Sequence, residues 1–103
     1  MMAFVHRHFG EDITVEDIAQ AGLVSRRSCF RLFQQQLHTT PTLYLRDYRL
    51  RRACALLAHS NATMTEIANA CCLGSSSYFG QQFRESYGIT PSRYRKQWHD
   101  IEK

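Results

Sequence analysis

Residues 14–19 are Thr-Val-Glu-Asp-Ile-Ala and residues 63–68 are Thr-Met-Thr-Glu-Ile-Ala, so one order of residue types occurs twice, 49 positions apart. Each copy has a threonine, an apolar residue, any residue, an acid, isoleucine and alanine. A threonine followed three residues later by an acid is typical of a capping box, in which each side chain bonds the other's backbone amide at a helix start. The stretch predicts a short helix in each copy, and its repetition predicts that both copies fold alike.

Further landmarks continue the repeat at an offset of 50 positions. They pair Phe33 with Phe83, Thr40-Pro41 with Thr90-Pro91, and Tyr44 with Tyr94. A threonine directly before a proline favours a helix start. The first amides of a helix have no partner within the helix, so proline, which lacks an amide hydrogen, loses nothing at the first helical position. We therefore expect another helix after each of these threonines.

Between these landmarks, apolar residues recur at helical spacing. The first copy is expected to form a short helix over residues 15–21, ending near Gly22, and a longer helix after Ser25. The second is expected to form a short helix over residues 64–71 and a longer one after Ser75, ended by Gly88 in a left-handed conformation. A short helix, a tight turn and a longer helix make a helix-turn-helix unit. The expected inward positions are Cys29, Leu32, Phe33 and Leu37 in the first long helix, and Phe79, Phe83 and Tyr87 in the second.

A longer helix is predicted between the two units, from Pro41 to about His59. Its expected apolar face consists of Leu43, Leu50, Ala53, Cys54 and Leu57. With a short opening helix over residues 3–9 and a last helix after Pro91, the total is about seven helices. The predicted fold is all-α, with a first helix-turn-helix subdomain over residues 1–40, a connecting helix over residues 41–59 and a second helix-turn-helix subdomain over residues 60–103.

Composition narrows the class of protein. The 103 residues suffice for one domain or two small subdomains, and 44% of them are hydrophobic, which is enough for a core. The 13 Lys and Arg exceed the 9 Asp and Glu, and most of the cations are arginine, which favours a nucleic-acid partner. No apolar run approaches the roughly 20 residues of a membrane helix, and a signal peptide is not recognisable. We expect a cytoplasmic protein without a membrane partner.

Catalytic and metal-binding motifs are not recognisable in the sequence. The four cysteines, Cys29, Cys54, Cys71 and Cys72, form no C-x-x-C pair and are expected to be reduced and structural. His6 and His8 are expected to be solvated or at the edge of the core. A Gly-rich phosphate loop, G-x-S-x-G and H-E-x-x-H are all missing. We therefore expect no enzymatic activity, no cofactor and no metal.

The face of the first long helix opposite its apolar positions carries Arg26, Arg27, Phe30, Arg31 and Gln34. One interpretation is a solvated helix face, which is the usual role of a charged run. The other is a surface that enters the DNA major groove, where arginine bonds guanine or phosphate, glutamine bonds adenine, and Phe30 contacts a thymine methyl. We favour the second, because three arginines need an anion and an exposed phenylalanine beside them points to a binding surface.

The corresponding face of the second long helix carries Ser76, Ser77, Gly80, Gln81 and Arg84. Serine and glutamine can bond phosphates or bases, and glycine permits a close approach, but this face lacks the paired arginines of the first. A polar surface without base contacts is the competing interpretation. Further cations on the connecting helix and near the end of the chain are candidate phosphate contacts or solubilising charge; they are Arg46, Arg49, Arg51, Arg52, Arg93, Arg95 and Lys96.

Specific strings of residues resemble the DNA-binding region of the AraC/XylS family of bacterial transcription regulators. The first copy has Ile-Ala-x-Ala at residues 18–21. The second copy matches over Ile67-Ala68-x-Ala70-Cys71-Cys72-Leu73 and then over Ser75-x-Ser77-Tyr78-Phe79-x-x-x-Phe83-x-x-x-Tyr87-Gly88-Ile89-Thr90-Pro91-x-x-Tyr94-Arg95. The resemblance covers essentially the whole chain, and the second string is the family's most distinctive one.

This resemblance implies sequence-specific binding of double-stranded DNA by a transcription regulator, here expected to be an activator, with both long helices in adjacent major grooves. The positions that match the family's base-contacting residues are Arg27, Phe30 and Arg31 in the first copy and Ser76, Ser77, Gly80 and Gln81 in the second. Two departures stand out. Cys72 occupies a turn position usually held by glycine, which costs about 1 kcal/mol if the residue is left-handed. Gln81 stands where arginine is frequent.

Family members usually carry a separate effector-binding or dimerisation domain before this region, although stand-alone members exist. The chain starts inside its expected opening helix, so we expect such a domain to precede it. A competing function is a protein-interaction module whose arginines and Phe30 dock on an acidic partner such as RNA polymerase, with only nonspecific DNA contact.

Overall fold

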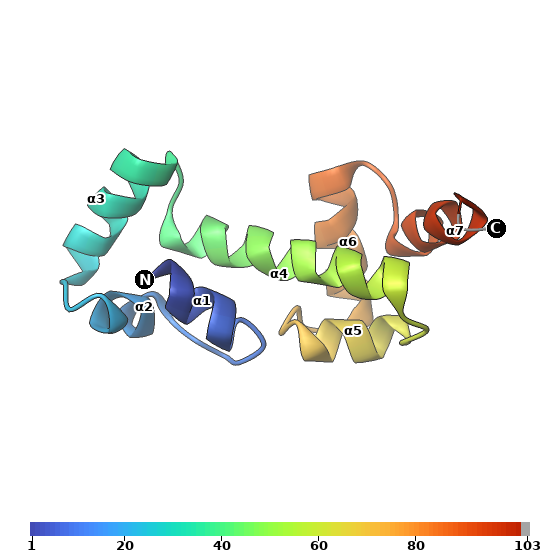
Figure 1. Cartoon of the computed structure of the whole chain (residues 1–103), viewed down its shortest axis with the longest axis horizontal. Helices are drawn as coiled ribbons and strands as arrows, with labels where there is room; N and C mark the ends of the chain where they lie inside the picture. Colours follow the sequence, from blue (N-terminus) through green and yellow to red (C-terminus); the bar gives the residue numbers. More distant parts are fainter. Residues whose placement is uncertain (102–103) are drawn as a thin grey trace. The chain divides into compact units, whose positions relative to one another are not determined.

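The computed structural model describes residues 1–101, and within them the chain forms seven α-helices and no β-strand (Figure 1). The helices are α1 (Met2–His8), α2 (Val15–Ala21), α3 (Arg26–Leu37), α4 (Pro41–His59), α5 (Met64–Ala70), α6 (Ser76–Tyr87) and α7 (Pro91–Ile101). The predicted all-α class is confirmed. None of the helices is both long enough and apolar enough to cross a membrane.

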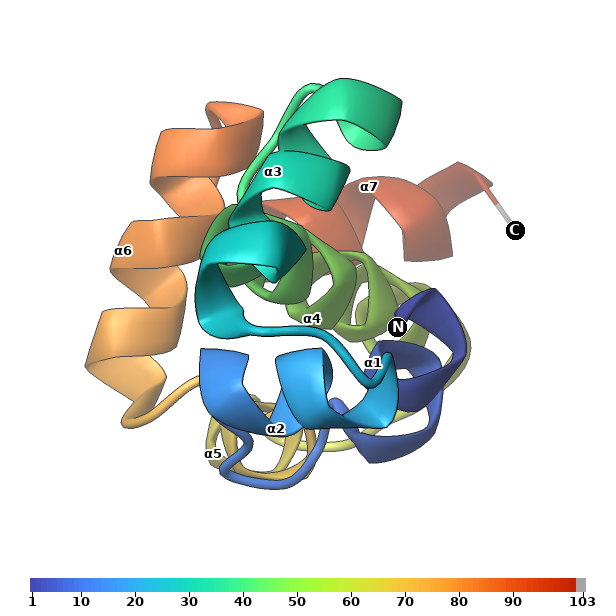
Figure 2. The same ribbon diagram turned by 90° about the vertical axis from the view of Figure 1, so that its left-hand side faces the viewer.

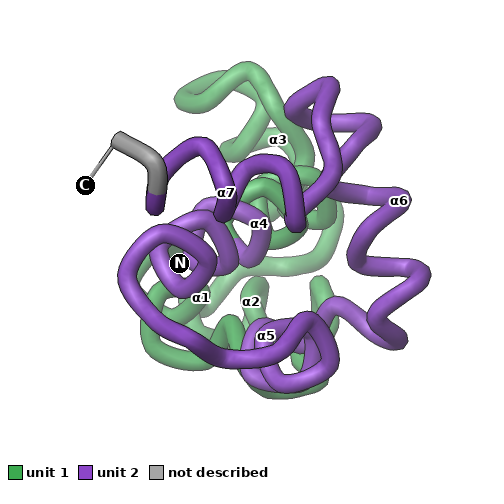
Figure 3. The backbone as a smooth tube through the Cα atoms, turned by 90° about the vertical axis from the view of Figure 1, so that its right-hand side faces the viewer, with its two compact units in different colours: residues 1–48 green, residues 49–103 purple. Residues whose placement is uncertain are grey.

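The chain divides into two compact units, residues 1–48 and the part that begins at Arg49 (Figure 3). The division falls within α4, so this helix contributes residues to both units. In the first unit α3 rises steeply from the end of α2 (Figure 2), which is the helix-turn-helix arrangement. In the second, α5 and α6 repeat it (Figure 1).

Both predicted capping boxes are present. The Thr14 hydroxyl accepts a bond from the Asp17 amide, and the Asp17 carboxylate accepts one of 2.9 Å from the Thr14 amide. Thr63 and Glu66 repeat this pair at the start of α5, again with 2.9 Å to the carboxylate. These bonds lower the pKa of Glu66, because the backbone amide of Thr63 stabilises the ionised carboxylate.

The turns of both helix-turn-helix units contain a residue with positive φ. Leu23 has φ 56° and Cys72 has φ 54°, and the two residues lie 49 positions apart in the repeat. Cys72 therefore adopts the left-handed conformation that the resemblance implies, without the usual glycine. Leu23 does so with 93% of its surface exposed. Each non-glycine residue in this conformation costs about 1–2 kcal/mol.

The core of the first unit packs helices α1 to α4 together. Its buried members are Val5, Ile18, Ala19, Cys29, Phe33 and Leu45. Two predicted inward positions are wrong: Leu37 is 36% exposed and Leu43 is 41% exposed. Leu37 lies in the last turn of α3, beyond the packing of Phe33, and on α4 Leu45 enters the core in place of Leu43.

In the second unit Pro91 of α7 is buried, and the buried hydrophobic residues come from α4, α5, the turn that follows α5, and α6. They are Leu50, Ala53, Leu57, Ala58, Ile67, Ala68, Cys71, Leu73, Phe79 and Phe83. The repeat extends to ring packing, because Tyr44 meets Phe33 edge-on and Tyr94 meets Phe83 edge-on, both with ring centroids 5.5 Å apart. Tyr87, predicted inward, is 41% exposed although its ring still packs on Phe83.

Arg95 performs a structural task in the second unit. Its guanidinium donates to the backbone carbonyls of Leu57 at 3.1 Å and Ser60 at 3.2 Å, with a longer contact to Leu56 at 3.5 Å. These carbonyls lie at and just past the end of α4, where intrahelical donors run out. The prediction that Arg95 is a phosphate contact or solubilising charge is therefore wrong.

All four cysteines are free thiols. Burial raises the pKa of Cys71 to about 11, against the opposing charges of Arg52 and Arg49. Burial also raises the pKa values of Cys29 and Cys54. A thiol that stays protonated is a poor nucleophile, so Cys29 and Cys71 act as buried apolar groups and Cys54 as a half-buried one.

Candidate nucleic-acid interface

The outward face of α3 begins directly after the turn of the first unit, where Ser25 caps the helix by accepting from the Ser28 amide. Arg26, Arg27, Arg31 and Gln34 are exposed on it, whereas Phe30 is half-buried. The expectation of an exposed phenylalanine is therefore wrong, because the aromatic ring is partly covered by its neighbours. One of these neighbours is Arg26, whose guanidinium carbon lies 5.6 Å from the ring centroid.

Arg26 already has an anion. Its Nη1 donates to Oε1 of Glu16 at 2.8 Å, and Glu16 belongs to the first turn of α2. The expectation that three arginines of this face need an external anion is therefore wrong for Arg26. An arginine engaged by a carboxylate and an aromatic ring is held in position and has less charge to offer a phosphate.

Arg27 and Arg31 differ from Arg26. In the part of the chain that the structure describes, neither has a carboxylate at ion-pair distance. They stand four residues apart on one helix, where like charges repel by about 0.2–0.5 kcal/mol. The face of α3 thus offers two adjacent free guanidinium groups, each with donors that match guanine edges or phosphate oxygens.

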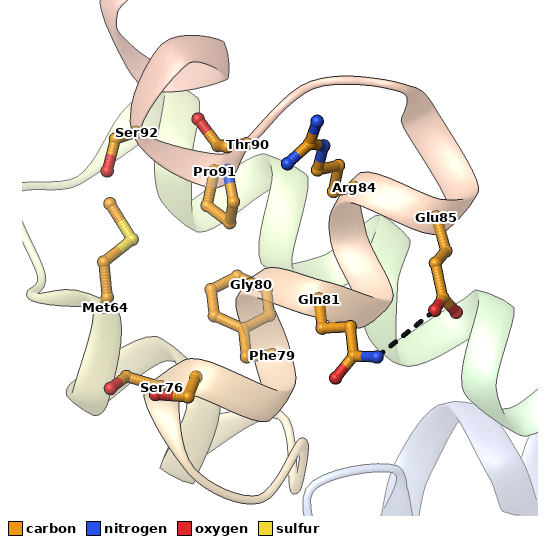
Figure 4. A pocket seen from close by; sticks show the side chains of 11 residues that line it. Met64, Ser76, Phe79, Gly80, Gln81, Arg84, Glu85, Thr90, Pro91 and Ser92 are labelled. Atoms are coloured by element: carbon orange, nitrogen blue, oxygen red, sulfur yellow. Dashed lines mark hydrogen bonds between the residues drawn. The ribbon is translucent and has the colours of Figure 1, made fainter.

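The outward face of α6 borders a groove of about 760 Å³ (Figure 4). All five predicted residues of this helix line it: Ser76, Ser77, Gly80, Gln81 and Arg84. The structure thus brings the second predicted set together on one surface. Sequence analysis missed the other side of the groove, which the start of α7 supplies through Thr90, Pro91 and Ser92. Only the tertiary packing of α7 beside α6 brings them there.

Gly80 leaves the middle of this groove open. A Cβ atom built at Gly80 would have nothing within 4 Å, so no packing contact in the described chain demands a glycine there. Glycine inside a helix costs roughly 0.5–1 kcal/mol relative to alanine. The opening it leaves permits close approach of a ligand to the α6 backbone.

Glu85 is a further residue of the groove that sequence analysis missed. Its Oε1 accepts a long hydrogen bond of 3.5 Å from Nε2 of Gln81. The signal available in the sequence was their spacing, because residues four apart lie on one face of a helix. Among the described residues that line the groove, Glu85 is the only acid and Arg84 the only base.

Within the described chain, no three His, Cys, Asp or Glu side chains are arranged to hold a metal ion. His6 contacts the Tyr44 hydroxyl at 2.7 Å and stacks on Tyr48, while His8 meets Glu11. Both histidines therefore have partners at the edge of the first core.

The family model of the helix-turn-helix domain matches residues 18–97 of this chain. An uncharacterised helix-turn-helix transcriptional regulator of Bacillus subtilis strain 168, YdeC, is 40% identical over 96 residues, which are 93% of this chain and 33% of that protein. The transcriptional activator RhaS of Salmonella schwarzengrund is 35% identical over the same length, 34% of its own chain. The chain therefore spans about a third of these curated relatives.

Solved structures agree in fold. A Chromobacterium violaceum transcriptional regulator with an AraC-type DNA-binding domain superposes with a TM-score of 0.90 and 34% identity, covering 94% of this chain and 87% of that one. The DNA-binding domain of AdpA, solved in complex with a target DNA, gives a TM-score of 0.91 and 28% identity, covering 97% and 90%. The latter relative has this fold while bound to DNA.

Proposed function

The chain belongs to the AraC family of helix-turn-helix transcription regulators, and from that premise we propose that it binds double-stranded DNA sequence-specifically through α3 and α6. Arg27, Phe30, Arg31 and Gln34 of α3 form one recognition surface, with Arg26 at its edge. Ser76, Ser77, Gly80, Gln81 and Arg84 of α6 form the other. Each helix enters a major groove, and the two grooves are adjacent on one side of the duplex.

One observation supports this proposal above the others: Arg27 and Arg31 are free of carboxylates in the described chain and repel each other. A polyanion relieves that repulsion. The forked guanidinium also bonds N7 and O6 of guanine at once, which is the commonest specific contact in the major groove. A solvated face also leaves arginines exposed and unpaired, so a preference for particular bases is the property that separates the two interpretations.

The α6 surface supports the same function with different chemistry. Its groove is open, hydroxyl-rich and close to neutral, so it contributes fewer phosphate contacts than α3. We expect the α3 half-site to contribute more binding free energy. We expect the α6 half-site, about 34 Å or one helical turn away, to set register and add specificity.

A protein-interaction module for an acidic partner is the competing hypothesis. It depended on an exposed Phe30 as an apolar anchor, and this ring is half-buried and covered by Arg26. Apolar anchors contribute much of the affinity of protein interfaces, so the half-burial of the Phe30 ring makes this hypothesis weaker.

The proposal is tested by selecting bound sites from a random pool of DNA duplexes. The selected site is then examined by footprinting. We expect two protected segments one helical turn apart and a preference that survives excess competitor DNA at 50 and 200 mM salt. Binding that loses every sequence preference at either salt concentration would favour the acidic-partner hypothesis instead.

The wider role follows the relatives. RhaS is named an activator, so we propose that this domain belongs to an activator that acts in the cytoplasm without enzymatic chemistry of its own. A second domain for an effector or for dimerisation, and a contact with RNA polymerase, belong to the same proposal.

A further inference from the structure

Gln81 and Glu85 lie one turn apart on α6, and Nε2 of Gln81 donates a hydrogen bond of 3.5 Å to Oε1 of Glu85 (Figure 4). An ionised carboxylate has only acceptor atoms, so the amide of Gln81 must turn its NH₂ group toward Glu85. Figure 4 shows the result: Nε2 faces Glu85, and Oε1 points away from it. Without Glu85, the two ends of this amide would be interchangeable.

The orientation of Gln81 decides which base it can contact. Adenine presents the N7 acceptor and the N6 amino donor in the major groove, whereas guanine presents two acceptors, N7 and O6. A glutamine with Oε1 outward accepts from adenine N6, and the second hydrogen on Nε2 remains for N7. The same glutamine meets guanine O6 with an oxygen of its own, which is repulsive.

Glu85 adds a second effect on the same surface. It is the only acid among the described residues of the groove, and a carboxylate near DNA weakens binding through repulsion of the phosphates. A residue that lowers general affinity but fixes a hydrogen-bond pattern contributes to specificity rather than to affinity.

We propose that Glu85 is a positioning residue that orients Gln81 to accept from adenine and to reject guanine in the α6 half-site. This inference rests on the proposed function, and it names the base at which α6 discriminates. It also separates the two surfaces by chemistry, because the arginines of α3 donate and therefore suit guanine.

Competition binding tests the inference. Duplexes that carry A or G at each position of the α6 half-site compete with the selected duplex for binding. The competition is measured for wild type, Gln81→Ala, Glu85→Ala and Glu85→Gln. We expect wild type to prefer A over G by roughly 5- to 150-fold at one position. Both Glu85 variants should bind DNA more tightly in general. Glu85→Ala should lose most of that ratio at the position where Gln81→Ala loses it, and Glu85→Gln, which keeps an acceptor but can also donate, should lose part of it.

Asp12→Asn is the matched control, because Asp12 is an exposed acid of the first unit and its loss changes net charge equally. It should leave the A to G ratio unchanged. A ratio that Glu85→Ala leaves intact, or a wild-type preference for G where Gln81→Ala acts, would overturn this inference alone. A wild-type domain without base preference anywhere would overturn the proposed function as well.

Discussion

Arg26 donates from Nη1 to the carboxylate of Glu16 at 2.8 Å, and this ion pair joins α3 to α2 across the turn of the first helix-turn-helix unit. Both side chains are more than half exposed, at 63% and 60%. An exposed pair of this kind contributes at most about 1 kcal/mol to folding. We expect its larger effect to be on the proposed DNA binding, because the bond to Glu16 competes with a contact between Arg26 and phosphate.

Glu16→Gln should therefore raise DNA affinity and steepen its salt dependence. One additional phosphate contact by Arg26 increases the slope of log K against log salt by up to about 0.9. Titrations between 50 and 200 mM salt measure that slope. Asp12→Asn removes the same charge without freeing an arginine, so equal slopes for both variants would contradict the role assigned to Glu16.

Arg31→Ala should weaken binding to the selected site by about 1–3 kcal/mol and relax the base preference at one position, as expected for loss of a contact with a base. Arg7→Ala is the control, because Arg7 is an exposed cation of α1, outside the recognition surface. It should weaken all sequences alike and only slightly. Identical base preferences for wild type and Arg31→Ala would remove Arg31 from the interface.

Arg95→Ala should reduce the free energy of unfolding by about 1–3 kcal/mol, because the end of α4 loses charged hydrogen bonds to its carbonyls. Arg95→Lys should recover only part of this, since lysine lacks the planar fork. Urea unfolding measures both. Arg93→Ala provides the contrast: Arg93 is exposed on the same helix, and its loss should lower DNA affinity in a salt-dependent way with little change in stability.

Leu23→Asn should stabilise the fold by about 0.5–1 kcal/mol. Asparagine tolerates the left-handed conformation that Leu23 adopts at φ 56°, and a side chain that is 93% exposed has little burial to lose. Ala21→Asn, at an exposed helical position two residues earlier, should instead destabilise. Thermal unfolding compares the two, and a stability loss for Leu23→Asn would mean that its side chain has a packing role.

Stability should decrease in acid through Glu66. Its folded-state pKa is lower than the ordinary 4.5, so its contribution is present above pH 4.5 and is lost as pH falls through the lower folded value. Glu66→Gln keeps an acceptor for the Thr63 amide but cannot titrate. Unfolding followed from pH 6 to 2 should show a shallower decline for this variant than for wild type, and parallel curves would contradict the assignment.

Much of the fold was predictable because its determinants are local. The capping boxes at Thr14 and Thr63, the threonine-proline helix starts and the left-handed Gly88 all depend on residues within a few positions of one another. Hydrogen bonds over three or four residues recur wherever the same residue types recur. The bounds of the helices therefore followed from the sequence to within about two residues.

The outward sets on α3 and α6 were also predictable, because helical spacing separates them from the buried positions. Helical spacing failed at helix ends and for a large ring: Leu37 and Leu43 have the right spacing for burial but are 36% and 41% exposed, and Tyr87 is 41% exposed although its ring packs on Phe83. The spacing of apolar residues predicts which side of the helix a side chain is on. It does not predict how much of that side chain the neighbouring helices cover.

The sequence by itself determined the repeated helices, their caps and the place of the two turns, since these depend on contacts within one or two helical turns. Only the tertiary structure decided which cations are free: Arg26 pairs with Glu16 ten residues away, and Arg95 bonds a carbonyl 38 residues away. Two opposite charges attract when they are close in space, however many residues separate them in the sequence. The partner of an arginine is therefore known only when the helices have packed.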